Sequence, residues 1–413
     1  GWGGRHFIPE LLGRPELSAR PCAELWLGSH GGGPAMAKFD EAKIPLTQLL
    51  AGAGEELLGA ETAREFGGQL PYLFKVLDAR QMLSIQAHPT LVQAAEGYER
   101  ENQAGVALTA ATRNYKDRNH KPEVHVALTE FWMLHGFRPL EEIAALLESV
   151  AELSPLMPDF RERLTQAGKA APPRADLLRS LYERAMTLPQ PQVDALLNPL
   201  IHRLEQQPPV DKHQPDFWVL RASREFPLPG GHRDRGIFSI YFLNLVQLRP
   251  GEATYQPAGT LHAYLEGVNV ELMANSDNVL RGGLTPKHVD VPELMRILNF
   301  DSGKPEIIAG RLDSPAERIY PAPAREFQLS RLQLDGSTVG HAGGKGAQIL
   351  LVLEGRATVQ SDGETLVLQR GEALLVPHQC VCQVKSASAT CHAAAATCSA
   401  CCSSCVRSRS ASS

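Results

Sequence analysis

The pattern of apolar and polar positions divides the chain into β-rich and helix-rich parts. PYLFKVLD (71–78) is a short apolar run with aromatic and β-branched residues, which predicts a buried strand. MLSIQAHP (82–89) and the VHVAL part of 119–137 alternate apolar and polar positions, which is typical of strands with one buried face. A polar, Ala-rich stretch between about 91 and 118 predicts a helix and a loop. Residues 1–138 are therefore expected to be mixed, with a β bias.

Residues 139–236 change to helical spacing. LEEIAALLESV, ADLLRSLYERAM and VDALLNPLIHRLEQQ each place apolar side chains three and four positions apart, and proline pairs separate these segments. Such stripes are typical of amphipathic helices that pack on one another, without polar groups set apart for chemistry. We expect a helical insertion between two β-rich parts.

The β pattern returns after the helices. IFSIYFL is compatible with either helix or strand, whereas the segments that follow alternate and carry Pro-Gly turns. TPKHVDVPELMRILNF (285–300) predicts a short helix with Asp290 as its N-cap and Pro292 in its first turn. Residues 322–385 predict further strands.

Two segments of the C-terminal half repeat one pattern. LRPGEATYQP (248–257) and LQRGEALLVP (368–377) share a leading leucine, a Gly-Glu-Ala turn and a proline six residues after the glycine. Such recurrence predicts two copies of a small β-barrel or double-sheet domain. The first copy continues as PAGTLH and the second as PHQC, so we expect the second copy to lack a metal ligand and to be structural.

Composition limits the classes of function. The chain has 413 residues and a formal net charge of −5, which argues against nucleic acid as a partner because phosphate binding needs a basic surface. No apolar run approaches about 18 residues, so we expect no membrane span. The N-terminus, GWGGRHFIPELLG, lacks the pattern of a signal peptide and opens without Met, so the start of the protein is expected to be missing.

Cysteines gather at the C-terminus. Cys22 stands alone in the first 379 residues, and the other seven lie between Cys380 and Cys405. A body with one cysteine suits a reducing compartment, and we expect a cytoplasmic location. The tail at 386–413 has almost no Leu, Ile or Phe, so we expect it to be disordered. Its two C-x₂-C pairs abut without the loop that would let them close around one zinc ion.

One histidine stands in a specific turn. Gly251 and Gly259 permit tight turns, Pro257 restricts one of them, and His262 follows at the start of a strand. This arrangement resembles the second motif of the cupin superfamily.

Three upstream residues complete a candidate metal site. Gln86 and His88 are two positions apart on one strand face, and Glu123 follows a Lys-Pro turn. Together with His262 they form an oxygen and nitrogen set for a divalent ion, for which zinc is the best match. One carboxylate leaves the ion net positive, which suits a Lewis acid that polarises a sugar oxygen.

Several longer motifs resemble the type I phosphomannose isomerases. The resemblance covers most of residues 1–300. Its segments are GWG (1–3), AELWLGSH (23–30), LPYLFKVL (70–77), LSIQAHP (83–89), NYKDRNHKPE (114–123), PGEA (250–253), HAYLEG (262–267) and ELMANSDNVLRGGLTPKHVDVPEL (271–294).

The resemblance implies a mainly β fold with an α-helical insertion and two cupin-like domains. The expected parts are a catalytic cupin (jelly-roll) domain at 1–138 and 237–300, a helical domain at 139–236, a cupin-like domain at 301–385 and the tail. It also implies reversible isomerisation of mannose 6-phosphate and fructose 6-phosphate, which supplies GDP-mannose synthesis and glycosylation. The implied protein is a monomer with one Zn²⁺ per chain, and the family's zinc ligands fall on the four residues named above.

The implied reaction moves a proton between C1 and C2 through a cis-enediol. The family's active-site arginine falls on Arg281, which either stabilises the enediolate or clamps the phosphate. Glu271 and Asp277 are candidate acid–base groups, although Glu271 could instead orient Arg281. The candidates for substrate binding and pocket walls are Lys121, Lys287, Tyr264, Ser84, His120 and Trp2.

Two other classes stay open at this point. A cupin iron dioxygenase usually has more histidine ligands, and Gln86 argues against it. A catalytically impaired or non-catalytic protein that binds a sugar phosphate is disfavoured by the complete ligand set. The sequence also departs from the family, because it lacks the strand before the Trp-Gly pair and has no predicted closing strands after 385. We therefore expect one edge of the first β unit to be open.

Overall fold

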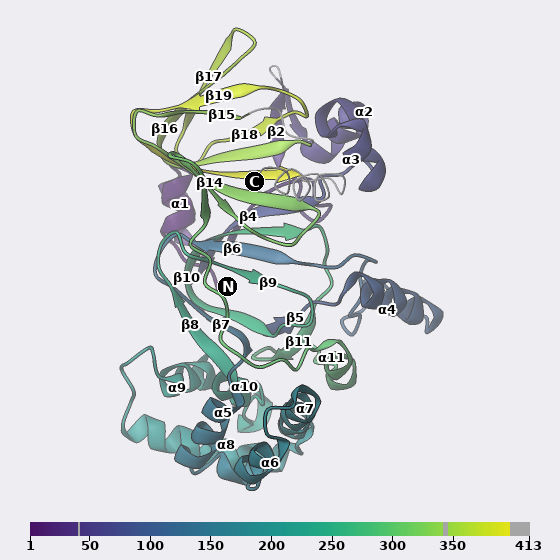
Figure 1. The fold of residues 1–413 in the computed structure, drawn as a ribbon, viewed down its shortest axis with the longest axis vertical. Coiled ribbons are helices and arrows are strands. Elements are labelled where there is room, and N and C mark those ends of the chain that lie inside the picture. Colours follow the sequence, from purple (N-terminus) through teal and green to yellow (C-terminus); the bar gives the residue numbers. More distant parts are fainter. Residues whose placement is uncertain (40–41, 342–345, 397–413) are drawn as a thin grey trace, which may run out of the picture.

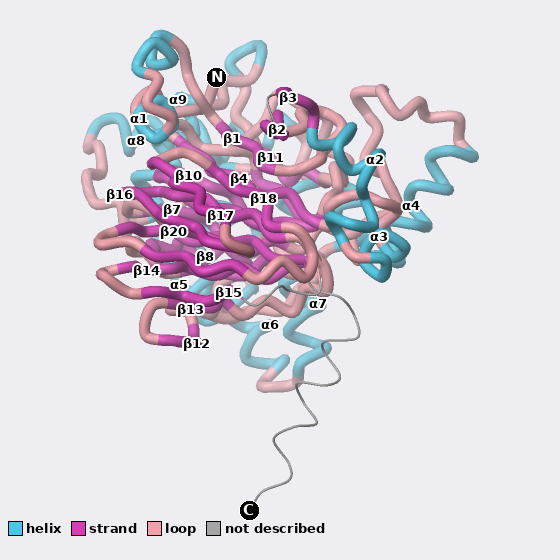
Figure 2. Tube along the Cα trace, turned by 90° about the horizontal axis from the view of Figure 1, so that it is seen from above, coloured by secondary structure: helices cyan, strands magenta, loops and turns pink. Residues whose placement is uncertain are grey.

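A computed structural model describes residues 1–39, 42–341 and 346–396 (Figure 1). Two nine-stranded antiparallel sheets and a two-stranded ribbon form its β part, and helices lie around them (Figure 2). The first sheet, here called the first β unit, contains β1 (Glu24–Leu27), β4 (Tyr72–Ala79), β5 (Ile85–Ala87), β6 (Glu123–Ala127), β7 (Phe131–Phe137), β8 (Leu243–Leu248), β9 (Ala253–Gln256), β10 (His262–Ala274) and β11 (Leu280–Gly283).

The second sheet, here called the second β unit, follows in the sequence. Its strands are β12 (Arg311–Ser314), β13 (Glu317–Tyr320), β14 (Phe327–Leu334), β15 (Thr338–His341), β16 (Gln348–Ser361), β17 (Glu364–Gln369), β18 (Ala373–Val376), β19 (Cys382–Lys385) and β20 (Ala389–Ala396). The separate ribbon consists of β2 (Met36–Phe39) and β3 (Ala42–Pro45).

Six α-helices connect β7 to β8 and form one end of the molecule in Figure 1. They are α5 (Leu140–Ser149), α6 (Phe160–Ala167), α7 (Ala171–Thr187), α8 (Gln190–Gln206), α9 (Pro215–Glu225) and α10 (Ile237–Phe242), with the 3₁₀ turns η2 (Ser154–Leu156) and η3 (Pro229–Gly231). The remaining helices are α1 (Phe7–Leu11), η1 (Pro15–Ala19), α2 (Leu46–Leu58), α3 (Ala60–Glu65), α4 (Leu91–Gln103) and α11 (Val291–Ile297). The described helices include none that is long and apolar enough to cross a membrane.

Among the described residues, four apolar cores hold the sheets and helices together. One lies inside the first β unit around Phe131 and Met133, and another joins that unit to the helical insertion. A third lies between the two β units, where Val270 of the first is clustered with Leu351 of the second. The fourth fills the second β unit. Because apolar burial is the main favourable term in folding, these shared cores fix the first β unit between its two neighbours.

The sequence repeat forms the same turn in both β units. Gly251 and Gly371 have φ angles of +88° and +82°, which favour glycine. The N–H of Gly251 donates to the carbonyl of Ala127 at 2.8 Å, and that of Gly371 donates to Val352 at 2.8 Å. The predicted internal repeat therefore corresponds to one repeated backbone arrangement.

Two local predictions were resolved by the structure. The ambiguous IFSIYFL segment begins as α10, in which every residue is buried. The predicted helix near 291 is confirmed, because Asp290 caps α11 by accepting a hydrogen bond from the N–H of Glu293 at 3.1 Å. β1 lies at one edge of its sheet.

The prediction of a disordered tail from 386 is wrong for its first part. Residues Ala389–Ala396 form β20, which lies between β14 and β16 and closes the second β unit. Alanine and cysteine bury well in a strand that is covered on both faces, and pairing on both edges satisfies its backbone, so few large apolar residues are needed. The two C-x₂-C pairs lie outside the described residues.

Candidate active site

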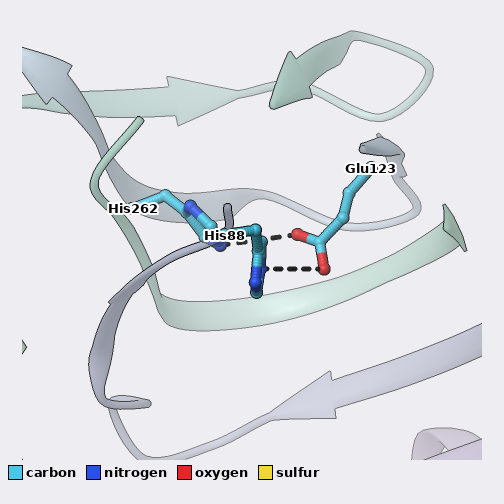
Figure 3. A group of neighbouring side chains, drawn as sticks. All are labelled: His88, Glu123 and His262. Atoms are coloured by element: carbon cyan, nitrogen blue, oxygen red, sulfur yellow. Dashed lines mark ion pairs between the residues drawn. The ribbon is translucent and has the colours of Figure 1, made fainter. Parts of the chain in front are cut away.

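Two histidines and a glutamate that are distant in the sequence meet in the first β unit (Figure 3). His88, Glu123 and His262 are buried, and one ligand atom of each lies within 4.8 Å of the others. His88 Nε2 lies 3.3 Å from Glu123 Oε1, and His262 Nε2 lies 3.4 Å from Glu123 Oε2. Among the described residues this is the one group of at least three His, Cys, Asp or Glu side chains with such geometry.

Strand pairing and one turn bring these residues together. Glu123 opens β6, and His262 opens β10 directly opposite Gln86 of β5. The N–H of Gly259 donates to the carbonyl of His88 at 2.8 Å, which ties the two histidine segments to each other. Gly259 has a φ of +78°, and a Cβ there would lie 2.9 Å from a backbone oxygen. The turn therefore requires glycine.

The second ring nitrogen of each histidine is held by the backbone. His88 Nδ1 donates to the carbonyl of Asn278 at 2.8 Å, and His262 Nδ1 donates to the carbonyl of Thr260 at 3.0 Å. Since a carbonyl can only accept, Nδ1 carries the proton and Nε2 of the neutral ring has a lone pair. Both Nε2 atoms are buried without a hydrogen-bond partner in the described residues.

Burial and nearby charges keep His88 and Glu123 in the protonation states that bind a cation. Burial lowers the pKa of His88 to about 4, and the charge of Lys121 contributes in the same direction. Burial by itself would raise the pKa of Glu123. The nearby charge of Lys121 instead brings the pKa of Glu123 well below its usual range, and the two histidines contribute in the same direction. At neutral pH, His88 is therefore neutral and Glu123 is ionised.

This donor set fits a divalent cation such as zinc. Imidazole nitrogens and a carboxylate are typical zinc ligands, and buried polar atoms without hydrogen bonds are rare unless something else satisfies them. Gln86, the fourth predicted ligand, lies opposite His262 in the sheet and lines the same cavity as Glu123. The geometry of the three clustered residues is thus consistent with the predicted ligand set.

A cavity of about 450 Å³ adjoins the clustered residues. Nine of the residues predicted from the sequence line it, and they come from both halves of the first β unit and its loops. These are Trp2, Ser84, Gln86, Lys121, Glu123, Tyr264, Glu271, Arg281 and Lys287.

A buried ion pair faces this cavity from β4 and β10. Lys75 Nζ lies 3.2 Å from Glu271 Oε2, and the hydroxyl of Tyr264 donates to Glu271 Oε1 at 2.6 Å. Burial would lower the pKa of Lys75, but Glu271, Glu24 and Glu123 raise it above its ordinary value. Lys75 is therefore charged, and both oxygens of Glu271 are occupied.

Two further cations line the cavity without partners. Arg281 lies on β11 opposite Gln86, and neither its side chain nor that of Lys287 has an ion pair or hydrogen bond in the described residues. The charge of Arg281, with burial and Lys116, lowers the pKa of Lys287. Two neighbouring cations that repel each other favour an anionic ligand between or beside them.

The other predicted residues have different surroundings. Lys121 Nζ lies 3.0 Å from Glu123 Oε1, so it contacts the metal-type group directly. Asp277 and His120 do not line the cavity. The Asp277 carboxylate is half exposed and lies 3.3 Å from His30, and His120 lies 2.7 Å from Glu326, which directly precedes β14.

Sequence reasoning missed Lys75 and its neighbour Glu24. Both line the cavity, and Lys75 Nζ also lies 5.3 Å from the centre of the Trp26 ring. The available signal was a single lysine inside the apolar run 70–77, because a charge within a buried strand needs a partner. The partner, Glu271, is known only from strand pairing, since Lys75 lies opposite it in the sheet.

Comparisons with known proteins agree with this geometry. Residues 2–140 match the family model described as phosphomannose isomerase type I, catalytic domain. A mannose-6-phosphate isomerase of Shigella flexneri is 37% identical over 381 residues, which cover 91% of this chain and 91% of the relative. The human mannose-6-phosphate isomerase is 35% identical over 374 residues, which cover 86% of this chain and 84% of the relative.

Solved structures extend the likeness to the whole fold. The mannose 6-phosphate isomerase from Salmonella typhimurium, in a crystal structure with substrate and zinc bound, has a TM-score of 0.83 and 34% identity. The alignment covers 96% of this chain and 96% of that chain. This likeness confirms the predicted mainly β architecture with a helical part.

Proposed function

Because the chain belongs to the type I phosphomannose isomerase family, we propose that it is an enzyme that interconverts mannose 6-phosphate and fructose 6-phosphate. The observation that carries this proposal is one cavity lined by Glu123 of the metal-type group and by the unpaired cations Arg281 and Lys287. A sugar phosphate needs both a polarising centre and an anion site. A protein that binds the sugar phosphate without catalysis is the less favoured alternative.

We propose that Gln86, His88, Glu123 and His262 hold one zinc ion per chain. The supporting observations are the two unpartnered Nε2 atoms and the carboxylate between them. When bound, zinc polarises a sugar oxygen and stabilises the negative charge that develops there.

The phosphate is assigned to Arg281 and Lys287. Both side chains line the cavity, and neither is neutralised by a described carboxylate. A bound phosphate would relieve their mutual repulsion, and the arginine fork matches two phosphate oxygens. Lys121 is assigned to the reacting end of the sugar instead, because it is already in contact with Glu123.

Proton transfer between C1 and C2 is assigned to Glu271 with Lys75. Glu271 lines the cavity, and Lys75 balances the charge of its ionised carboxylate, so Glu271 is present as a base that can accept a proton and return it. Asp277 is left outside this set because its carboxylate pairs with His30 away from the cavity. Trp2 and Ser84 are assigned to the cavity wall.

A coupled assay with mannose 6-phosphate tests the proposal. The purified protein should form fructose 6-phosphate, complete chelation should abolish the activity, and added zinc should restore it. Glu271→Gln should lower kcat by about 10²–10⁴-fold, the range for a positioned proton-transfer group. Glu266→Gln is the matched control, because Glu266 lies on the same strand but pairs with Lys212 and Arg221.

Full activity in metal-free protein would contradict the zinc assignment, and unchanged kcat in Glu271→Gln would contradict the proton-transfer assignment. Zinc bound by a protein without isomerase activity would favour the binding-only alternative.

We also propose the predicted division into a catalytic domain, a helical domain and a second cupin-like domain, with the last extended to Ala396 by β20. A monomeric state and a cytoplasmic location stay predictions, the latter supported by the single cysteine in the first 379 residues. Sedimentation of the purified chain and localisation of a tagged full-length protein would test them.

A further inference from the structure

The two β units share a backbone arrangement but have different interiors. In the first unit β6 pairs with β9, which sets His125 opposite Thr254. In the second unit β16 pairs with β18 in the same register, which sets Leu350 opposite Leu374. The repeated turns place Gly251 three residues before Thr254 and Gly371 three residues before Leu374. The residues of one unit can therefore be matched to those of the other.

This matching pairs polar residues of the first unit with apolar residues of the second. The three pairs carried by register are His125 with Leu350, Thr254 with Leu374 and Gln256 with Val376. Two more pairs lie on the strands that close each unit: Tyr264 with Val384, and Glu271 with Ala393. All the apolar members of these pairs belong to the core of the second unit, or pack against it.

In the first unit the polar residues form one hydrogen-bonded chain. Gln256 Nε2 donates to His125 Nδ1 at 3.1 Å and lies 3.4 Å from the hydroxyl of Tyr264. With Nδ1 accepting, the neutral imidazole carries its proton on Nε2, which donates to Thr254 Oγ1 at 3.0 Å. Tyr264 in turn donates to Glu271 Oε1 at 2.6 Å. The chain thus runs from the buried His125 to Tyr264 and Glu271, which line the cavity.

Such a chain is not needed for folding. Buried polar groups must be fully hydrogen-bonded to avoid a cost, and an apolar interior is the simpler solution. The second unit shows that solution on the same backbone arrangement, with Leu350 and Val376 in its core and Leu374 packed against it. The polar interior of the first unit therefore has a role at the adjoining cavity.

We propose that His125, Thr254 and Gln256 are positioning residues for the reaction. They do not line the cavity and act through Tyr264. Because Gln256 supplies a donor to the tyrosine oxygen, the tyrosine proton is directed at Glu271, and His125 with Thr254 holds the Gln256 amide in that orientation. This inference rests on the proposed isomerase function and assigns the three residues to the orientation of its proton-transfer carboxylate.

The central test compares Gln256→Met, which keeps the side-chain length but removes the donor, with the wild-type protein. We expect kcat for mannose 6-phosphate to fall at least about 10-fold while KM changes less than about threefold, because an orientation important in the transition state is lost. His125→Leu, which copies Leu350, should behave alike. His125→Asn places an amide oxygen near the Nδ1 position and should recover part of kcat.

A matched control separates positioning from stability. Val126→Ala changes the neighbouring residue of β6, whose side chain belongs to the core between the two β units. It should lower the melting temperature and leave kcat unchanged. Zinc content, measured on every variant, should stay at the wild-type value.

Wild-type kcat in folded, zinc-loaded Gln256→Met and His125→Leu would overturn the proposal. Loss of zinc in step with loss of kcat would also overturn it, because the residues would then support the ligand Glu123 instead of Tyr264. If one variant fails to fold, the other two still decide the question.

A crystal structure of Gln256→Met keeps this inference separate from the proposed function. The hydroxyl of Tyr264 should leave its 2.6 Å contact with Glu271. An unchanged contact in Gln256→Met would overturn the positioning role, whether or not the wild-type protein is active on mannose 6-phosphate. If the tyrosine is displaced in Gln256→Met but the wild-type protein is inactive, the result counts against the isomerase assignment alone.

Discussion

The first and second β units place different chemistry on one backbone arrangement. Strand register puts Gln348 where the first unit has Glu123, and the repeated turn puts Cys382 where it has His262. Gln348 carries no charge, so this position of the second unit lacks the carboxylate that a cation needs. Among the described residues, the metal-type group occurs in the first unit alone. A fold therefore does not by itself imply the site.

The connections of the units differ as much as their interiors. In the first unit β7 and β8 are joined through the helical insertion, whereas in the second unit β16 and β17 are joined by Asp362 and Gly363. Both turn residues have positive φ angles, 45° and 83°, as a tight hairpin requires. A long insertion at a hairpin tip is tolerated because loop length costs little, provided that the insertion buries its own apolar faces. Here the helices do so against the first unit.

Copying one residue of the second unit into the first should have the largest effect. Glu123→Gln reproduces Gln348 with almost no change in volume. We expect zinc content to fall to background, and activity to fall more than about 10²-fold, since even residues that only support a metal ligand cost up to that much. Metal analysis and the coupled assay measure both. Retained zinc with Gln at this position would break the comparison, because the second unit would then lack a site for another reason.

The buried ion pair offers a second exchange. Register places Ser330 of the second unit where the first has Lys75, and Ala393 where it has Glu271. Lys75→Ser leaves the Glu271 carboxylate buried and should cost about 3–5 kcal/mol of unfolding free energy. The double variant with Glu271→Ala copies the second unit and should recover most of this stability, although not the activity. Denaturant unfolding measures the difference, and equal losses in both variants would show that the unpaired Glu271 carboxylate is not what destabilises Lys75→Ser.

Metal removal should lower the stability of the protein only when the metal-type group of the first β unit is intact. A ligand that binds the folded state at about 100–1,000 times its Kd stabilises it by about 2.7–4.1 kcal/mol. We expect chelation to lower the unfolding free energy of the wild-type protein by that amount and to leave Glu123→Gln unaffected. Thermal unfolding with and without EDTA is the measurement. A similar drop in both proteins would place the stabilising metal elsewhere.

A smaller effect is expected from a histidine of the second unit. Burial lowers the pKa of His392 to about 3, with Arg331 adding to the effect, and its Nδ1 has no described hydrogen-bond partner. The unfolded chain takes up this proton near pH 6.5 and the folded chain only near pH 3, so stability is lost as pH falls through this window. Between pH 7.5 and pH 5 the unfolding free energy should therefore fall by about 2 kcal/mol less in His392→Leu than in the wild-type protein.

Unfolding free energies of the wild-type protein and His392→Leu, measured at both pH values, check this prediction. Identical pH dependence would mean that His392 is protonated in the folded state and is not held neutral by burial.

Much of this molecule follows from local sequence. A short apolar run predicts β4, and alternation predicts β6. Three- and four-residue spacing predicts α5, α7 and α8, and Asp290 marks the start of α11. The glycine and proline framing of His262 identifies the turn that carries the histidine, because few residues can adopt its backbone angles. Signals of this kind depend on neighbours along the chain, so they can be recognised in the sequence without a structure.

Tertiary structure decided what depends on pairing between distant strands. The charge of Lys75 in a buried strand is explained only by Glu271, which lies opposite it in the sheet. Asp277 pairs with His30 outside the cavity. β20 was missed for the same reason. Its alanines bury little apolar surface, and the strand forms because β14 and β16 pair with both of its edges. Composition and spacing determine which elements can form, whereas the charge and hydrogen-bond partners of a buried side chain are set by residues that the sequence places far away.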